Sequence, residues 1–379
     1  MLYICTVPFI DEVTVSHKPT DRLSLANALY PPTQHPAAGG IQRLPPPPSL
    51  LPHPATLGIG LRAAVIAKED FLPWIYVTNR FKAFQASLAL TVGQRADGVT
   101  KFGGLMACLN TAYRGHNSKA ENGFMIGSWA KDTCIRPPRD VDMYYVLPIE
   151  VFHRYQAYAP GVNKQSALLQ EVKNKLLLSY PRSDIRGNGP IVLADFHGHT
   201  VEIAPAFVYD PADRSYIVCD TKNRGKYLIT KPMHEVDAVN YADATTHNNA
   251  RPLIRMLKCW QAYCTVPIKS FYLELLAIEF LGLWPYNEHG PFYYDWMCRD
   301  FFQWMILRAN MAVIAPGTYD INWLGDGWKT RAESAYGRAS KACDFERSNN
   351  MIDAGDEWQK IFGNDIPRMV DGSTYPRNN

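Results

Sequence analysis

The sequence predicts an α+β fold in which a lobe with a mixed sheet and helices is followed by a helical lobe. Two observations carry this prediction. Short apolar runs that are typical of strands are confined to the middle of the chain. After about residue 245, apolar residues recur instead at helical spacing over stretches that are longer than a strand. With 379 residues, of which 47% are hydrophobic, the chain is long enough to bury a sizeable core.

Residues 1–70 differ in composition from the rest of the chain. They are rich in proline and include the run Pro45–Pro48, which favours polyproline II and excludes a helix. Because apolar residues show little periodicity here, the segment buries too little surface to offset the entropy of ordering it. We therefore expect a proline-rich, disordered extension. The alternatives are a polyproline ligand for a partner protein and a start codon placed too early.

Residues 71–245 are predicted to form the first lobe. Apolar residues at helical spacing predict helices within Phe71–Leu90 and over Val99–Tyr113. Strands are predicted over Val141–Leu147, Ile191–Phe196 and Val201–Phe207. Between the last two strands, His197-Gly-His-Thr200 is typical of a hairpin turn. A zinc half-site at this turn, which Asp195 would join, is the alternative interpretation, but no cluster of Cys or His completes four ligands.

Residues 246–379 are predicted to form the helical lobe. Helices are expected over Arg251–Tyr263, Ser270–Leu283 and Pro291–Asn310. The stretch Leu273–Trp284 is strongly apolar, but it contains Glu274 and Glu279 and is shorter than the roughly 20 residues that a membrane span needs. No internal repeat is visible in either lobe.

Charge and cysteine content exclude several classes of protein. Lysine plus arginine exceed aspartate plus glutamate by 39 − 36 = 3, which excludes a strongly basic nucleic-acid coat but leaves room for local basic patches. The N-terminus carries Asp11 and Glu12 without a basic segment, so it does not look like a signal peptide. The eight cysteines are scattered without CxxC pairs, which favours a reduced, cytoplasmic protein away from membranes.

Acidic residues on two predicted strands carry the chemistry. Asp140 and Asp142 point to the same face of a strand, because they are two residues apart. Two carboxylates this close repel each other unless a cation lies between them. Glu202, on another predicted strand, could complete a ring of three hard oxygen ligands suited to Mg²⁺ or Mn²⁺. Upstream, Gly127-Ser128 offers backbone N–H groups and a hydroxyl to phosphate oxygens.

Each of these pieces has a plainer interpretation when it is taken alone. The Asp-x-Asp pair would be a solvated strand face, Glu202 a salt-bridge partner, and Gly-Ser an ordinary turn. Their order along the chain and their strand context favour the metal site over these interpretations.

The same pieces resemble a known family. The segment Gly127–Asp142 (GSWAKDTCIRPPRDVD) is similar to the signature of bacterial cGAS/DncV-like nucleotidyltransferases (CD-NTases, SMODS type), which belong to the polymerase-β-like superfamily. Val201–Phe207 (VEIAPAF) resembles their third-acid strand, which oligoadenylate synthases share. Segments Arg251–Trp260, Lys269–Glu274 and Trp358–Gly363 resemble helices and the tail of the family's C-terminal lobe. The resemblance covers about residues 70–379.

The resemblance implies roles for seven residues. Residues 71–245 would be the catalytic lobe, and residues 246–379 would complete the donor-triphosphate site. Catalysis and the binding of two Mg²⁺ (or Mn²⁺) ions would fall to Asp140, Asp142 and Glu202. Nucleotide binding would fall to Gly127, Ser128, Lys258 and Ser270. Without the family, Lys258 is also interpretable as a surface lysine and Ser270 as the N-cap of the helix that follows it.

Departures from the family pattern affect the base pocket more than the chemistry. Glu202 stands where many relatives have Asp, but both residues ligate Mg²⁺. Asp132 stands where Gly, Arg or Asn is common. Residues 219–243 match only loosely, which leaves the choice of nucleobase open.

The resemblance implies a metal-dependent nucleotidyltransferase that makes a cyclic di- or trinucleotide second messenger from NTPs, ATP among them, in bacterial antiphage (CBASS-type) defence. A separate effector would bind the product rather than the enzyme, and a regulatory protein or a nucleic-acid activator stays open. The alternatives are a linear nucleotidyltransferase (oligoadenylate-type, tRNA-end-adding or protein-nucleotidylating) and a silent nucleotide-sensing module. These residues do not fix the linkage, the ring size, the trigger or the oligomeric state.

Overall fold

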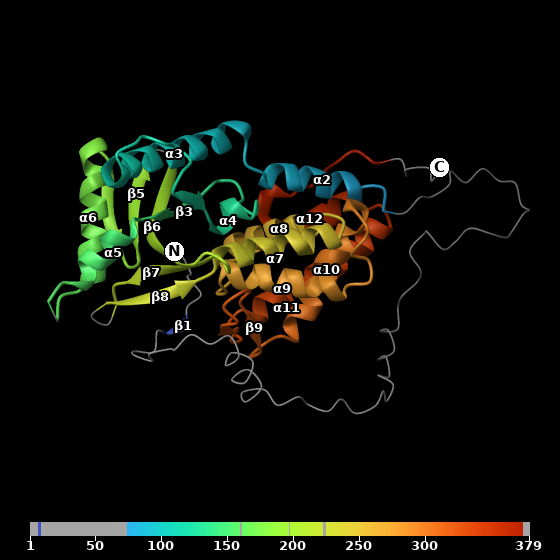
Figure 1. Cartoon of the computed structure of the whole chain (residues 1–379). Helices are drawn as coiled ribbons and strands as arrows, with labels where there is room; N and C mark the ends of the chain where they lie inside the picture. The colour runs from blue at the N-terminus through green and yellow to red at the C-terminus, as the bar shows by residue number, and fades with distance from the viewer. Residues whose placement is uncertain (1–6, 9–73, 160, 197, 223–224, 374–379) are drawn as a thin grey trace, which may run out of the picture. The chain divides into compact units, whose positions relative to one another are not determined.

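The computed structural model describes residues 7–8, 74–159, 161–196, 198–222 and 225–373 of the chain (Figure 1). The extension predicted over residues 1–70 lies outside these ranges, apart from Val7–Pro8. These two residues form β1, which pairs antiparallel with β8 (Lys226–Thr230).

The first lobe is built on a mixed sheet that has eight strands within the described ranges. Its order is β1-β8-β7-β6-β3-β2, with β5 also paired to β6 and β4 paired to β5. All neighbours are antiparallel except β3 and β6, which run parallel. The remaining bounds are β2 Gly123–Met125, β3 Asp140–Val146, β4 Asp184–Asn188, β5 Ile191–Phe196, β6 His199–Asp210 and β7 Ser215–Asp220.

The two faces of β3 have different surroundings. The helices of this lobe are α3 Val92–Arg114, α4 Gly127–Ala130, α5 Ile149–Gln156 and α6 Lys164–Ser179. Val141 and Met143 pack in a core with residues of α3 and α6, which cover one face of the sheet (Figure 1). Because strand residues alternate, Asp140 and Asp142 point to the opposite face. The two aspartates therefore lie on the sheet face that α3 and α6 leave open.

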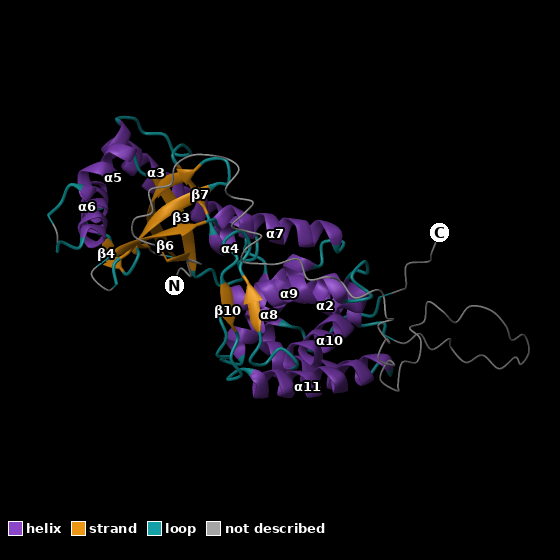
Figure 2. Cartoon of the chain, turned by 60° about the horizontal axis from the view of Figure 1, so that its bottom comes forward, coloured by secondary structure: helices purple, strands orange, loops and turns teal. Residues whose placement is uncertain are grey.

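Helices make up most of the second lobe (Figures 1 and 2). They are α2 Val77–Leu88, α7 Pro232–Thr245, α8 Ala250–Tyr263, α9 Ser270–Leu283, α10 Tyr294–Ile306, α11 Lys329–Arg347 and α12 Met351–Phe362. Shorter elements are the 3-10 turns Pro291–Tyr293 and Gly363–Asp365 and the hairpin strands β9 Ala312–Ile314 and β10 Ile321–Trp323. Helix α2 lies within residues 71–245, which the sequence assigns to the first lobe, but its Phe81 and Phe84 are buried in the helical core. The ring of Phe81 lies 5.2 Å from that of Trp358, so α2 packs against α12.

Most predicted elements are present close to their predicted bounds. Strand β5 and helix α9 have the bounds that the sequence predicts. The hairpin turn is confirmed, because Phe196 pairs with His199 and Gly198 takes a φ of +92°, which favours glycine. Strands β2, β4, β7 and β8 and helices α5, α6, α7, α11 and α12 are present without having been predicted from the sequence.

Other expectations concern the histidines, the cysteines and membranes. His199 Nδ1 lies 2.8 Å from Asp97 Oδ2, and Asp195 accepts a hydrogen bond from Thr200. These contacts occupy two members of the alternative zinc half-site, while its third member, His197, lies outside the described residues.

The seven cysteines in the described ranges are free thiols. Among the described helices, none combines the length and the apolar character that crossing a membrane requires.

Candidate active site

Three carboxylates meet on the open face of the sheet. Strands β3 and β6 run in a register that places Asp142 directly beside Glu202. Asp140 lies two residues before Asp142 and shares its face. One carboxylate oxygen from each residue lies within 4.8 Å of the corresponding oxygens of the other two. The structure therefore brings together the three carboxylates that the sequence singles out.

This proximity changes the protonation of Asp142. Burial, together with the nearby charges of Asp140 and Glu202, raises the pKa of the Asp142 carboxyl group to about 8. Glu202 is itself only 5% exposed, so water screens these charges poorly. Without a cation, the protein therefore favours the protonated form of Asp142 at neutral pH.

The chemistry of this donor set fits a hard divalent cation. Carboxylate oxygens are the ligands that Mg²⁺ and Mn²⁺ prefer, and a bound cation reverses the electrostatic penalty of burying like charges. Among the described residues, these three carboxylates are the group of side chains that lie close enough together to hold a metal ion, and the group contains no imidazole or thiolate. Asp140, Asp142 and Glu202 are therefore suited to hold the metal that the sequence predicts.

The Gly127-Ser128 turn lies against the carboxylates. The N–H of Ile126 donates to the carbonyl of Asp142 at 2.9 Å, which fixes the turn beside β3. Gly127 has a φ of +60°, and a Cβ atom there would lie 2.2 Å from Asp142 Oδ2. Glycine is therefore required at this position both for its backbone conformation and for the close approach of Asp142.

A cavity of about 420 Å³ contains this turn and both aspartates of β3. Its walls come from both lobes. Charged and polar residues in its lining include Ser128, Lys131, Arg139, Asp140, Asp142, Glu235, Lys258, Lys269, Ser270 and Glu274. The volume falls within the range that small-molecule sites occupy.

The structure places Lys258 in the cavity wall and corrects one interpretation of it. Lys258 is only 8% exposed, so the alternative of a surface lysine is wrong. Its Nζ donates to Glu274 Oε1 at 2.6 Å, and to Oγ1 and the carbonyl of Thr133 at 2.9 and 3.1 Å. The ammonium group therefore connects α8 of the helical lobe to the segment that follows the Gly-Ser turn.

Ser270 also lines the cavity, but it is not the N-cap of its helix. It is the first residue of α9, and Lys269 occupies the cap position without a capping hydrogen bond from its side chain. The Ser270 hydroxyl instead donates to Gln261 Oε1 at 2.7 Å. A capping serine precedes the first residue of its helix, whereas Ser270 is itself the first residue of α9. The N-cap interpretation of Ser270 is therefore wrong.

Asp132, which departs from the family pattern, connects the two lobes. Its carboxylate lies 2.7 Å from an Arg95 nitrogen of α3 and 3.0 Å from an Arg255 nitrogen of α8. Arg255 also donates to the carbonyl of Asp132 at 2.6 Å. The residue thus contributes to the contact between the lobes rather than to the cavity lining.

Several charged residues of the cavity wall were not predicted from the sequence, among them Lys131, Glu235 and Glu274. Lys131 follows the Gly-Ser turn, while the two glutamates come from α7 and α9. For Glu274 a signal was present, because it is one of two acids in an otherwise apolar stretch. For Lys131 and Glu235 no local signal distinguishes a buried charge from an exposed one.

Comparison with known proteins finds matches to a large part of the chain and to its fold. Residues 76–242 match the family model of the Second Messenger Oligonucleotide or Dinucleotide Synthetase domain (SMODS). The chain is 22% identical over 281 residues to a "Probable cyclic nucleotide synthase" of Bacillus cereus (strain VD146). This match covers 65% of the chain and 82% of the relative.

Solved structures of two proteins show the same fold. CdnC of E. coli MS115-1, in a structure with ATP, matches with a TM-score of 0.55 and 16% identity over 76% of this chain and 98% of that chain. The same CdnC in a complex with HORMA-deltaN matches with a TM-score of 0.54 and 16% identity over 75% and 96%. The Vibrio cholerae DncV cyclic AMP-GMP synthase matches with a TM-score of 0.57 and 13% identity over 77% and 96%. These matches confirm the predicted fold class.

Proposed function

Because the chain belongs to the cGAS/DncV-like nucleotidyltransferases (CD-NTases), which have the polymerase-β-like fold, we propose that it joins NTPs into a cyclic di- or trinucleotide in a metal-dependent reaction. The observation that carries this proposal is the group of three carboxylates beside the Gly127-Ser128 turn. This group supports chemistry at a phosphate, because phosphoryl transfer depends on positioning and on neutralising charge rather than on a protein nucleophile.

The three carboxylates take the metal-binding role in this proposal. Asp140, Asp142 and Glu202 would hold two divalent cations from two adjacent strands. Cations bound there would lower the pKa of an attacking hydroxyl group and neutralise the leaving pyrophosphate. The rigid pairing of β3 with β6 fixes the spacing of the ligands before substrate binds.

The remaining predicted residues take the nucleotide-binding role. The Gly127 backbone and the Ser128 hydroxyl would contact phosphate oxygens, while Lys258 and Ser270 would hold the triphosphate from the helical lobe. A 3′- or 2′-hydroxyl oxygen of one nucleotide then forms a bond to the α-phosphorus of another, and the bond to pyrophosphate breaks. Repeating this step within one linear intermediate closes the ring.

The proposed setting is bacterial antiphage defence of the CBASS type, in the cytoplasm. ATP is the first substrate to test, since CdnC has been solved with ATP. A separate effector would bind the cyclic product. A regulatory protein is also part of the proposal, because CdnC forms a complex with HORMA-deltaN.

The proposal is tested by incubating the protein with four labelled NTPs and Mg²⁺ or Mn²⁺, followed by phosphatase and mass spectrometry. We expect a phosphatase-resistant product whose mass equals that of two or three nucleotide units without a terminal phosphate. Products that phosphatase degrades would establish the linear nucleotidyltransferase instead. Binding of NTPs without any product, in the presence of either metal, would establish the nucleotide-sensing module.

A substitution in the Gly-Ser turn tests whether this turn belongs to the site. We expect Gly127→Ala to lower turnover about tenfold, because the new Cβ displaces Asp142 and small displacements of catalytic groups have large effects. Steady-state kinetics and a melting curve measure the two consequences.

The matched control for this variant is Gly115→Ala. Gly115 ends α3 with a φ of +74°, and a Cβ atom added there would have no neighbouring atom within 4 Å, so alanine strains the backbone without a clash. Equal losses of turnover in the two variants would mean that the turn does not position Asp142.

A further inference from the structure

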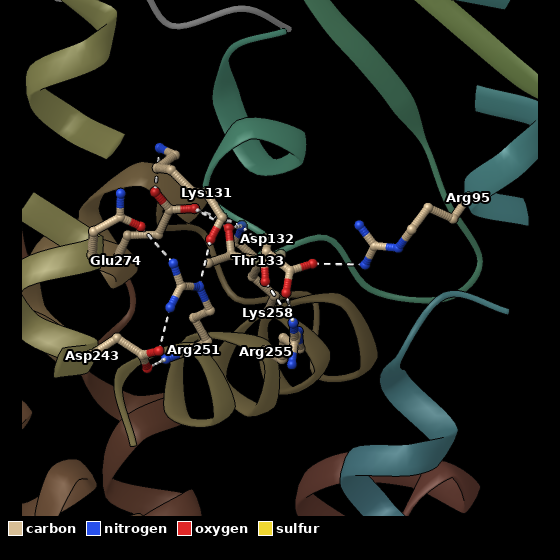
Figure 3. Close-up of polar contacts among 10 residues, drawn as sticks. Arg95, Lys131, Asp132, Thr133, Asp243, Arg251, Arg255, Lys258 and Glu274 are labelled. Atoms are coloured by element: carbon tan, nitrogen blue, oxygen red, sulfur yellow. Dashed lines mark hydrogen bonds and ion pairs between the residues drawn. The ribbon is translucent and has the colours of Figure 1, made fainter. Parts of the chain in front are cut away.

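A buried cluster of charges lies where the two lobes meet (Figure 3). Glu274 of α9 accepts hydrogen bonds from two lysines, one on each carboxylate oxygen. Lys131 Nζ lies 2.5 Å from Oε2, and Lys258 Nζ lies 2.6 Å from Oε1. The exposed fractions of Lys131, Lys258 and Glu274 are 4%, 8% and 3%. One carboxylate thus holds two ammonium groups, from different lobes, away from bulk water.

The two lysines differ in the hydrogen bonds that they can still make. An ammonium group has three N–H donors. Those of Lys258 have three acceptors, which are Glu274 and two oxygen atoms of Thr133. Within the described ranges, Lys131 has two acceptors, Glu274 and Glu235, the latter at 3.2 Å. Lys131 therefore retains one N–H that is available to a ligand in the cavity. Lys258 must instead give up a hydrogen bond to the uncharged Thr133 before it binds the same ligand.

Glu274 opposes the effect of burial on both lysines. Burial lowers the pKa of Lys258, and the charge of Glu274 works against this loss of its proton. Burial acts against the charge of Lys131 too, but Glu274 and Glu235 outweigh it and raise its pKa. Burial alone would raise the pKa of Glu274, yet the two ammonium groups hold it at about 2. The difference between the lysines follows from their partners, because Lys131 contacts two carboxylates and Lys258 only one.

We propose that Glu274 is a positioning residue, which holds the ammonium groups of Lys131 and Lys258 side by side in the cavity wall to receive the triphosphate of an NTP. This inference rests on the proposed function. All three residues line the cavity that contains the Gly-Ser turn and the aspartates of β3. Glu274 itself would not touch the reacting atoms. Its contribution would pass through the two lysines, which it keeps close together despite their mutual repulsion.

The experiment measures the binding of inorganic tripolyphosphate to the whole protein by calorimetry, in EDTA, from about pH 6.5 to about pH 9. In Glu274→Gln, the amide no longer compensates two buried ammonium groups, so protons leave the pair at lower pH. We expect the Kd of this variant, divided by the wild-type Kd, to rise about tenfold or more across that range. Dividing the Kd of the variant by the wild-type Kd at the same pH cancels the effect of pH on the charge of tripolyphosphate itself.

The groups that face or act on the two ammonium groups come from several neighbouring elements. They are Thr133 and Cys134 after α4, Asp142 of β3, Glu235 of α7, and Glu274 of α9, with Asp132, Arg251 and Arg255 in the adjoining contacts. Asp142, whose pKa is about 8, is present in the wild type and in every variant of this experiment, so the Kd ratio compares proteins that share its titration. Glu274→Gln changes the charge of one member only. The matched control is Glu279→Gln on the same helix, where Glu279 pairs with Arg308 at 2.6 Å outside the cavity lining. For this control we expect a Kd ratio near one at every pH.

Three results would overturn the proposal. A ratio that is raised but constant with pH would show a purely structural role for Glu274. Tighter binding by Glu274→Gln at every pH would show that the carboxylate only competes with phosphate for the lysines. A wild-type protein that does not bind tripolyphosphate would show that the lysines do not receive a phosphate chain.

A second variant covers the case in which Glu274→Gln does not fold. Glu274→Asp keeps the charge but shortens the side chain by one methylene group, so its carboxylate cannot reach both lysines. We expect the same rise of the Kd ratio with pH, to a smaller extent, and a flat ratio would overturn the proposal. Failure of the proposed function is a separate result, since it would appear as wild-type protein that binds tripolyphosphate but converts no NTP.

Discussion

Replacing Asp140 and Asp142 together by asparagine is expected to abolish NTP turnover while the protein still folds. Amides do not supply the charged oxygen ligands that two divalent cations need, and phosphoryl transfer depends on those cations. We expect the rate to fall below about one-thousandth of the wild-type rate. Product formation by mass spectrometry measures the loss, and a melting curve shows whether the variant is folded.

The stability of this variant distinguishes lost chemistry from lost structure. The pKa of Asp142 is about 8 when folded and 3.8 in its ordinary state, so the folded protein binds this proton more tightly than the unfolded chain. The stability gained in this way is complete below the ordinary pKa and is lost as the pH rises through about 8. Near pH 8 and without metal, we therefore expect the double variant to melt no lower than the wild type. Added Mg²⁺ should raise the melting temperature of the wild type alone.

A control carboxylate lies on the neighbouring strand β5. Asp195 is exposed, and its carboxylate accepts a hydrogen bond from Thr200 at 3.2 Å rather than joining the group of three. Asp195→Asn should therefore leave turnover and the response to Mg²⁺ unchanged. If the Asp140 and Asp142 double variant is folded and turns over NTPs at the wild-type rate, these residues are not the metal ligands.

The sequence predicts those helices and strands whose own residues carry a clear apolar pattern. The bounds of α9 are predictable because the helix is apolar over four turns, and those of β5 are predictable because turn residues lie on both sides of the strand. Strand β2 has only three residues and exists because it pairs with β3. Its three residues have no alternation to detect, since tertiary pairing rather than local propensity makes them a strand.

The candidate site divides in the same way. The two aspartates of β3 are predictable because the side-chain period of a strand places them on one face. That Glu202 lies beside Asp142 depends on the parallel pairing of β3 with β6, which no local pattern encodes. Glu274 and Glu279 lie on the same apolar helix, yet one is buried between two lysines and the other pairs with Arg308. Only the packing of the lobes decides which of these acids belongs to the site.

Lys258→Ala is expected to lower kcat/KM for NTPs by roughly 10–10³-fold, as the loss of one cationic contact to a developing phosphate charge would. The substitution also removes the hydrogen bonds to Thr133 and Glu274, so a structural effect must be separated from the chemical one. Arg255→Ala provides this separation. Arg255 lies one turn away on α8 and makes a comparable contact between the lobes, to Asp132, without lining the cavity. If Lys258 receives the triphosphate, its variant loses far more kcat/KM than the Arg255 variant at a similar loss of melting temperature. Equal kinetic losses would instead mean that Lys258 serves only to connect α8 to the segment after the Gly-Ser turn.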